Sequence, residues 1–132
     1  MKNIKDILER TRRDKIFIRF KKEIDALKLR NESKIVLAIS GGVDSIGLLL
    51  LLKALNKYQL FLVHVNHGLR ERSNIEEKFI VKLSKEINIP LYIKKLDPSI
   101  IEKMSIEEWG RTNRYKYLEK ILIDTKSEFI MT

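Results

Sequence analysis

The chain has 132 residues, of which 44% are hydrophobic and 34% are charged. This apolar content is enough to form the core of one folded domain and is too high for a disordered chain. The longest apolar run, residues 46–52, is far shorter than the roughly 20 residues that cross a bilayer, and the charged N-terminus lacks the apolar segment of a secretory signal. We therefore expect a soluble, cytoplasmic protein that does not associate with membranes.

Two further features of the composition bear on function. The chain has no cysteine, which excludes disulfides, thiolate metal sites and cysteine nucleophiles within it. Its net charge of +9 favours an anionic partner, such as RNA or a phosphate-bearing ligand. A lysine-rich surface that only aids solubility explains the charge equally well, because the excess is spread along the chain and forms no dense basic tail.

The chain divides into an N-terminal segment, residues 1–33, and a domain, residues 34–132. In the first segment, apolar side chains recur at three- and four-residue intervals from Ile4 to Leu27. This spacing predicts an amphipathic helix that packs on the domain.

In residues 34–132, short β-branched apolar runs alternate with stretches of helical periodicity. We expect strands at residues 34–39, 60–65, 91–96 and 128–131, and helices at residues 46–58, 73–87 and 105–124. The last two helices begin with the pattern of a capping box, in which a serine precedes a glutamate by three residues: Ser73 with Glu76, and Ser105 with Glu108. The alternation implies right-handed crossovers and an α/β fold, a parallel sheet with helices on both faces.

The first predicted strand leads into a hexapeptide, Ser40-Gly41-Gly42-Val43-Asp44-Ser45, that we call the glycine loop. Its two glycines permit a sharp turn, and the amides and positive dipole end of the next helix face that turn, which suits a phosphate. Ser40 and Ser45 add hydroxyl donors, and Asp44 can hold Mg²⁺ or a water molecule. The alternative is an ordinary strand-to-helix turn, but the complete string between a strand and a helix favours phosphate binding.

The second predicted strand ends in the segment His64-Val65-Asn66-His67-Gly68-Leu69-Arg70. His64 and Asn66 are two residues apart, so their side chains point to the same face of the sheet. Because neighbouring parallel strands end at the same edge, this segment is expected beside the glycine loop. Two histidines without a cysteine fall short of the four ligands of a structural zinc site. Simple turn chemistry is the alternative for this segment.

The last predicted helix carries Arg111 and Arg114, which are three residues apart and therefore share one face. Two guanidinium groups on one face can grip a phosphate or a nucleic-acid backbone. The alternative is that they pair with Glu107 and Glu108 on a solvated surface, which contributes little energy. Trp109 is expected to pack in the core and not to stack on a base.

Taken in chain order, the strings SGGVDS, HVNHGLR followed by Ser73, and EEWGRTNRY resemble the N-terminal part of the tRNA(Ile)-lysidine synthase family. The first string is similar to the PP-loop of ATP pyrophosphatases, and the resemblance covers about residues 35–132. It implies a Rossmann-like PP-loop domain and a ligase. That family uses ATP to adenylate the C2 oxygen of the wobble cytidine in tRNA(Ile); lysine then attacks C2, which gives lysidine, AMP and pyrophosphate.

The resemblance also implies roles for individual residues. Residues 40–45 would bind ATP, residues 64–66 would border the adenosine, and the arginines would face phosphates of ATP or tRNA. The implied catalytic residues are Asp44, Arg111 and Arg114, with Asp44 on Mg²⁺, and the implied ATP-binding residues are Ser40, Gly41, Gly42, Val43, Asp44, Ser45, His64, Val65, Asn66 and Arg70. The alternatives are a PP-loop enzyme that thiolates tRNA, which the lack of cysteine disfavours, and a nonenzymatic module that binds ATP or AMP.

In that family, the fourth strand continues into a His-His and paired-Asp segment and then into tRNA-binding domains. This sequence ends at Thr132, before those residues. The resemblance therefore implies a PP-loop domain that is incomplete at its C-terminus. The chain would be either a fragment or a truncated product that binds nucleotide poorly and catalyses nothing. An exposed sheet edge and apolar surface would favour instability or association, as in a homodimer.

Overall fold

The computed structural model describes residues 4–68, 71–100 and 105–132. Its sheet consists of β1 (Lys34–Ala38), β2 (Gln59–Asn66), β3 (Leu91–Lys95) and β4 (Phe129–Met131), in the order β3-β2-β1-β4. All three strand pairs are parallel, so the predicted α/β fold is confirmed. Each strand lies within one residue of its predicted bounds at either end.

The two neighbours of β2 pair with different parts of it. The pairing with β1 ends at Ala38 opposite Val63, whereas the pairing with β3 continues to Asn66 opposite Lys95. The carboxyl end of β2 therefore projects beyond β1 and leaves backbone groups on that side without a neighbouring strand.

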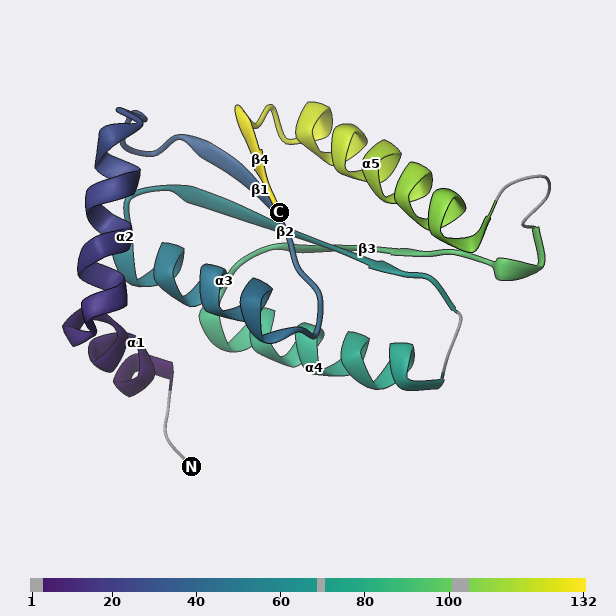
Figure 1. The fold of residues 1–132 in the computed structure, drawn as a ribbon, viewed down its shortest axis with the longest axis horizontal. Helices are drawn as coiled ribbons and strands as arrows, with labels where there is room; N and C mark the ends of the chain where they lie inside the picture. The colour runs from purple at the N-terminus through teal and green to yellow at the C-terminus, as the bar shows by residue number, and fades with distance from the viewer. Residues whose placement is uncertain (1–3, 69–70, 101–104) are drawn as a thin grey trace.

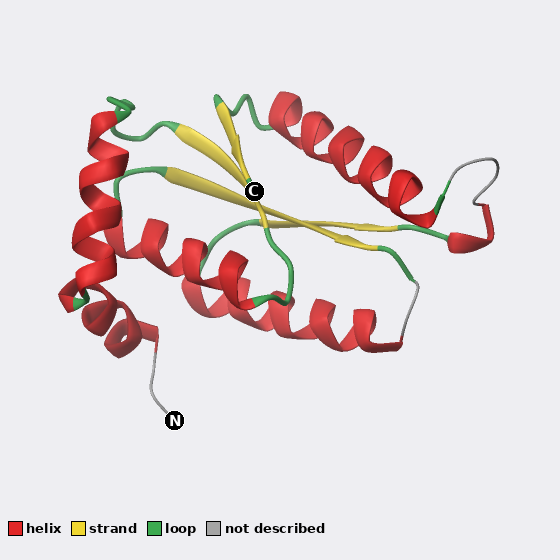
Figure 2. Cartoon of the chain, in the orientation of Figure 1, coloured by secondary structure: helices red, strands yellow, loops and turns green. Residues whose placement is uncertain are grey.

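Helices cover both faces of the sheet. Figure 1 shows α3 (Val43–Leu55) and α4 (Glu71–Ile87) on one face and α5 (Ile106–Asp124) on the other, and Figure 2 shows the same layers by type of element. Side chains of β1 alternate between the two cores. Packed on the α3 and α4 side are Ile35, Leu37, Leu49, Leu52, Leu60, Leu62, Ile80 and Ile87, and on the α5 side Val36, Val63, Leu118 and Ile121.

The N-terminal segment forms two helices, α1 (Ile4–Arg13) and α2 (Lys15–Ala26), where the periodicity predicted one. The break falls at Asp14, whose carboxylate accepts a hydrogen bond of 2.8 Å from the Ile16 amide and so caps α2. The segment packs against α3: Arg12 Nε donates to the carbonyl oxygen of Ala54 at 2.9 Å.

Two helices begin earlier than the sequence predicted. α3 begins at Val43, so half of the glycine loop belongs to its first turn. α4 begins at Glu71, so Ser73 lies inside the helix and the predicted capping box there is wrong. The cap at Ser105 is confirmed, since its side chain accepts a 3.2 Å hydrogen bond from the Glu108 amide. No helix in the described part of the chain is long and apolar enough to span a bilayer.

Candidate functional site

The glycine loop lies at the carboxyl edge of the sheet, between β1 and α3, and its two serines hold it in shape. Ser45 Oγ accepts a hydrogen bond of 3.0 Å from the Ser40 amide and lies 2.9 Å from the Ser40 carbonyl oxygen. Ser40 Oγ accepts one of 3.2 Å from the Gly42 amide. The serine hydroxyls, predicted as donors to a phosphate, thus also brace the loop from within.

The remaining amides of the loop are open. Within the described residues, the amides of Gly41, Val43, Asp44 and Ser45 have no acceptor, and the first intrahelical hydrogen bond of α3 runs from Ile46 to Gly42 at 3.2 Å. Residues 41–44 are exposed. Four unpaired N–H groups, three of them on exposed residues and one on the half-buried Ser45, therefore lie at the positive end of a helix dipole, an arrangement suited to an anion.

Asp44 supplies one exposed carboxylate on the first turn of α3. Across the described residues no three His, Cys, Asp or Glu side chains come together as a metal site. Mg²⁺ commonly binds one or two carboxylates and completes its octahedron with water and substrate phosphates. The donor set here fits a magnesium ion that arrives with a polyphosphate, and it is too sparse for a metal site made by the protein alone.

The end of β2 is fastened to the end of β1 beside the loop. His64 is buried, and its Nδ1 lies 2.9 Å from the carbonyl oxygen of Ile39. The Ile39 amide in turn donates to the carbonyl oxygen of Val63 at 2.9 Å. Backbone groups of residues two apart in a strand point to the same side, so the amide and carbonyl of Val65 point toward the β1 side, as those of Val63 do. Neither group of Val65 has a partner among the described residues. They form an open donor and acceptor pair next to the glycine loop.

Asn66 is used differently, because its side chain is 3% exposed and fully engaged. Its Nδ2 lies 3.2 Å from Asn74 Oδ1 and 3.3 Å from Glu77 Oε1 on α4. Its Oδ1 accepts a 2.9 Å hydrogen bond from the Gly68 amide. Asn66 therefore ties β2 to α4 and shapes the turn that follows; the role beside adenosine stays a prediction for its backbone.

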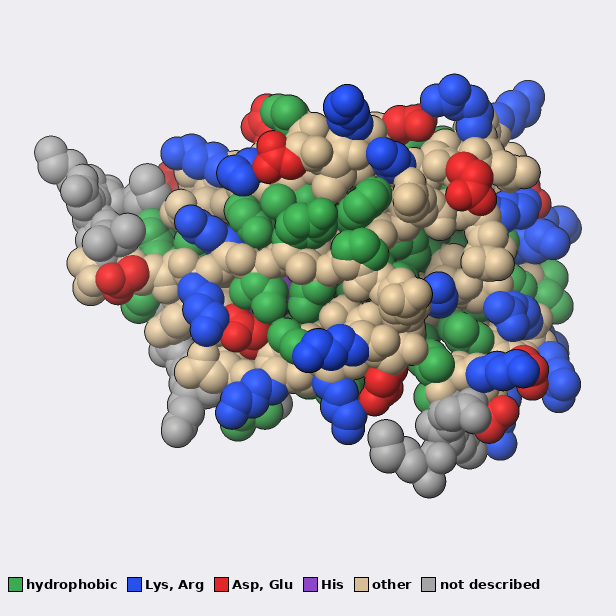
Figure 3. Space-filling model, turned by 180° about the vertical axis from the view of Figure 1, so that it is seen from behind, with side chains coloured by type: hydrophobic (Ala, Val, Ile, Leu, Met, Phe, Trp, Pro, Cys, Tyr) green, Lys and Arg blue, Asp and Glu red, His purple; other side chains and the backbone are tan. Residues whose placement is uncertain are grey.

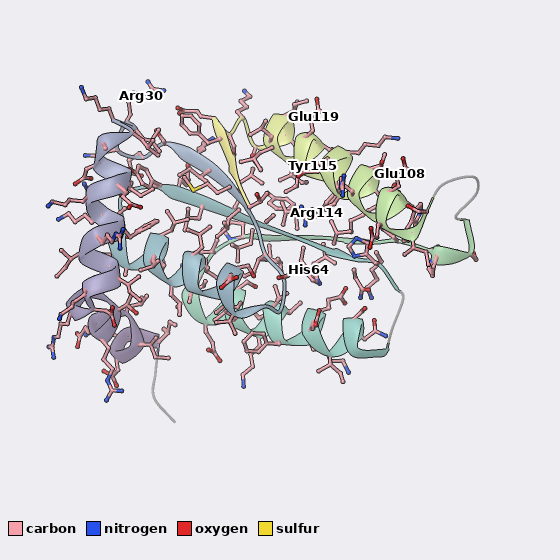
Figure 4. The ribbon with its side chains drawn as sticks, viewed as in Figure 1. Arg30, His64, Glu108, Arg114, Tyr115 and Glu119 are labelled. Carbon is pink, nitrogen blue, oxygen red and sulfur yellow. The ribbon has the colours of Figure 1, made fainter. Side chains whose placement is uncertain are left out.

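Arg111 and Arg114 lie together, as predicted from their spacing. Both line a cavity of about 350 Å³ with His67, Ile106, Glu107 and Gly110. The described residues show no ion pair between these arginines and Glu107 or Glu108. Arg114 is half-buried, and its Nε is buried without a hydrogen-bond partner. Figure 4 shows its side chain extending from α5 toward the sheet.

α5 is docked closely enough to fix these arginines. Tyr117 Oη donates to the carbonyl oxygen of Ile93 at 3.3 Å, and burial raises the pKa of Tyr117. Trp109 is 5% exposed and packs edge-on to His67, with ring centroids 6.2 Å apart, which confirms its packing role. A Cβ at Gly110 would lie 3.0 Å from His67 Cδ2, so the glycine allows this approach.

A second cavity, of about 240 Å³, joins the predicted groups; we call it the central cavity. It brings Ser40 and Ser45 of the glycine loop to His64 and Arg114. Its full lining is Ala38, Ile39, Ser40, Ser45, Val63, His64, Val65, His67, Glu76, Arg114, Leu118 and Thr132. Glu76 was missed as a site residue because its spacing from Ser73 was interpreted as a helix cap. Arg70 lies outside the described residues.

A parallel α/β sheet with an open glycine loop at its carboxyl edge defines a class of nucleotide-binding proteins. The chain belongs to the PP-loop family, whose domain model matches residues 13–132. Membership of this family implies that the chain binds ATP.

Among curated proteins, the chain is similar to tRNA(Ile)-lysidine synthases. It is 37% identical to that of Thermosipho africanus over 110 residues, which cover 78% of this chain and 26% of the relative. It is 39% identical to that of Staphylococcus epidermidis over 108 residues, 76% of this chain and 24% of the relative. The chain thus spans about a quarter of the length of these relatives.

Solved structures show the same fold. A U34-tRNA thiolase from Methanococcus maripaludis superposes with a TM-score of 0.67 at 24% identity, over 77% of this chain and 38% of that one. An NH3-dependent NAD synthetase from Campylobacter jejuni superposes with a TM-score of 0.63 at 18% identity, over 100% of this chain and 57% of that one. At these identities the likeness concerns the fold alone.

Proposed function

We propose that this chain is the ATP-binding part of an enzyme that joins lysine to the wobble cytidine of tRNA(Ile), with AMP and pyrophosphate as the other products. The reaction is the one that the resemblance to the tRNA(Ile)-lysidine synthase family implies, and the part assigned to this chain is argued from its own geometry. The observation that carries the proposal is the set of four open amides at the start of α3, which matches the negative charge of a polyphosphate.

The groups around the glycine loop divide the work of holding ATP. The open amides take phosphate oxygens, and the backbone donor and acceptor of Val65 face the edge of the adenine. His64, held by the Ile39 carbonyl, keeps the end of β2 at a fixed distance from the loop. Each contact is made by backbone that the fold holds in place, so little ordering is needed when the nucleotide binds.

The remaining polar side chains would act on the phosphate groups, where negative charge develops during the reaction. They are Arg111, Arg114 and Asp44. Asp44 would hold Mg²⁺, and the ion would supply positive charge beside the departing pyrophosphate. Arg114, which lines the central cavity, would contact the α-phosphate or the tRNA oxygen that attacks it. Arg111, more exposed on the same face of α5, meets the tRNA backbone. Fixed donors of this kind stabilise a transition state without reorganisation.

The test has two stages, the first on this chain and the second on the longer enzyme of which we propose it to be part. Isothermal titration measures Mg–ATP binding, and a coupled assay then measures pyrophosphate released from ATP with tRNA(Ile) and lysine present together or singly. We expect release only when both are present. Saturable ATP binding without release would favour the nonenzymatic module, and release that requires a sulfur donor in place of lysine would favour thiolation.

A further inference from the structure

Glu76 of α4 lies directly against the glycine loop. A Cβ built on Gly41 would lie 2.9 Å from Glu76 Cγ and 3.1 Å from Glu76 Cδ. Contacts this short require one side to move, so the glycine at position 41 is what allows the acidic side chain to come so close. The same side chain lines the central cavity, and it is the one Asp or Glu side chain among the described residues that line it.

The carboxylate of Glu76 has no partner in the part of the chain that the structure describes. Its neighbour in sequence, Glu77, forms an ion pair of 3.3 Å with Lys95 and accepts a hydrogen bond from Asn66. Arg114 lines the same cavity, yet these two residues form no ion pair with each other. One cavity thus contains an unpaired carboxylate and a guanidinium whose buried Nε is also unpaired.

These charges conflict with a simple anion site. A carboxylate beside a loop that binds a polyphosphate repels it, and the repulsion is strong in a half-buried cavity where water screens poorly. A divalent cation between the two removes the conflict, and Mg²⁺ accepts two carboxylates together with phosphate oxygens. A ligand that carries both cation and phosphate would satisfy Glu76 and Arg114 at once.

We infer that Glu76 is a second acidic residue, after Asp44, that holds the Mg²⁺ of Mg–ATP at the glycine loop. This inference rests on the proposed function, because it places the nucleotide there. It makes Glu76 a selector: the carboxylate opposes ATP without a metal and favours ATP with one. The inference also explains why position 41 is a glycine, since a Cβ there would lie 2.9 Å from Glu76 Cγ.

The experiment compares Glu76→Gln with Glu86→Gln, an exposed glutamate on the same helix and remote from the cavity lining. Isothermal titration measures the dissociation constant of ATP with excess Mg²⁺ and with EDTA. For Glu76→Gln we expect Mg–ATP affinity to fall about tenfold, as for loss of one charged contact, while affinity for metal-free ATP rises. Glu86→Gln should change neither value.

Opposite changes in the dissociation constants of ATP with Mg²⁺ and with EDTA would show that Glu76 acts through the metal ion. An equal fall with and without Mg²⁺ would show that Glu76 only supports the loop, and an equal rise would show simple repulsion; either result, or no change, overturns the inference. In those three cases the unaltered chain still binds ATP, so the proposed function stands. If the unaltered chain binds no ATP with or without Mg²⁺, the proposed function and this inference fail together.

Discussion

Two neighbouring segments at the carboxyl edge of the sheet differ in whether their polar groups have hydrogen-bond partners within the protein. The loop after β1, residues 40–45, leaves four backbone amides without an acceptor among the described residues. The loop after β2 is closed by Asn66, whose buried side chain contacts α4 and the Gly68 amide at the same time. The first loop has open donors that a ligand could use, whereas the polar atoms of the Asn66 side chain find their partners within the protein.

Because of this difference, we expect one segment to determine the stability of the fold and the other to determine the affinity for a ligand. A buried polar group without a partner costs free energy, so the interactions of Asn66 stabilise the fold directly. Open amides in water cost little, because water satisfies them until a ligand replaces it. Substitutions in the loop after β2 should therefore lower stability first, and those in the glycine loop should lower affinity at nearly constant stability.

The largest effect is expected for Asn66→Ala. It removes the contacts to Asn74 and Glu77 and leaves the Gly68 amide without its acceptor, which should lower the free energy of unfolding by about 2–3 kcal/mol. Urea denaturation followed by circular dichroism measures the change. Asn74→Ala, which removes one contact from an exposed residue, is the control and should cost less than about 1 kcal/mol. Equal losses for the two variants would contradict the central role of Asn66.

A smaller loss of stability is expected for Gly68→Ala. Gly68 has a φ of +67°, and a Cβ there would lie 2.8 Å from the carbonyl oxygen of Leu96. The left-handed conformation alone costs a residue with a side chain about 1–2 kcal/mol. Gly47→Ala is the matched control, because nothing lies within 4 Å of its Cβ position in α3; it should stabilise the chain by about 0.5–1 kcal/mol. Thermal denaturation of both variants should show shifts in opposite directions.

Asp44→Ala tests the other loop. The carboxylate is exposed, so the free energy of unfolding should stay within about 0.5 kcal/mol of the unaltered chain. Affinity for Mg–ATP should fall about tenfold, since one contact to a charged group is lost, and affinity for ATP in EDTA should change much less. Unchanged Mg–ATP affinity would remove the proposed role of Asp44. A loss of stability as large as that of Asn66→Ala would erase the distinction between the loops.

Much of this contrast could be predicted from the sequence. The buried strand 34–39 and the apolar helix after it are long, uniform signals, and the glycine loop between them is a local motif whose geometry follows from its residues. The three-residue spacing of Arg111 and Arg114 also predicted that they share one face of the helix, and both line one cavity. These are features in which neighbouring residues decide the structure.

The features that were missed depend on contacts between distant segments. Ser73 and Glu76 fit a capping box locally, but α4 begins two residues earlier, and the Ser73 carbonyl lies 3.5 Å from Nδ2 of Asn66 on β2. The approach of Glu76 to Gly41 joins α4 to the end of β1. The sequence pattern of neither segment predicts this contact. Gly110, a glycine inside α5, is a local signal of a close approach, and the ring of His67 lies against it.

The smallest effects are expected on α5, where the two arginines extend the comparison between enclosed and open groups. Lys and Arg side chains are spread over much of the face in Figure 3, so the loss of one exposed charge is easily masked. Arg111 is exposed, and Arg111→Ala should weaken Mg–ATP or tRNA binding about twofold at low salt, with the difference lost near 0.5 M salt as screening grows. Arg114 is half-buried with an unpaired Nε, so Arg114→Ala should cost about fivefold and keep most of that loss at high salt. Binding measured by titration across a salt series separates the two, and identical salt dependence for both variants would show that burial of Arg114 does not shield its contact.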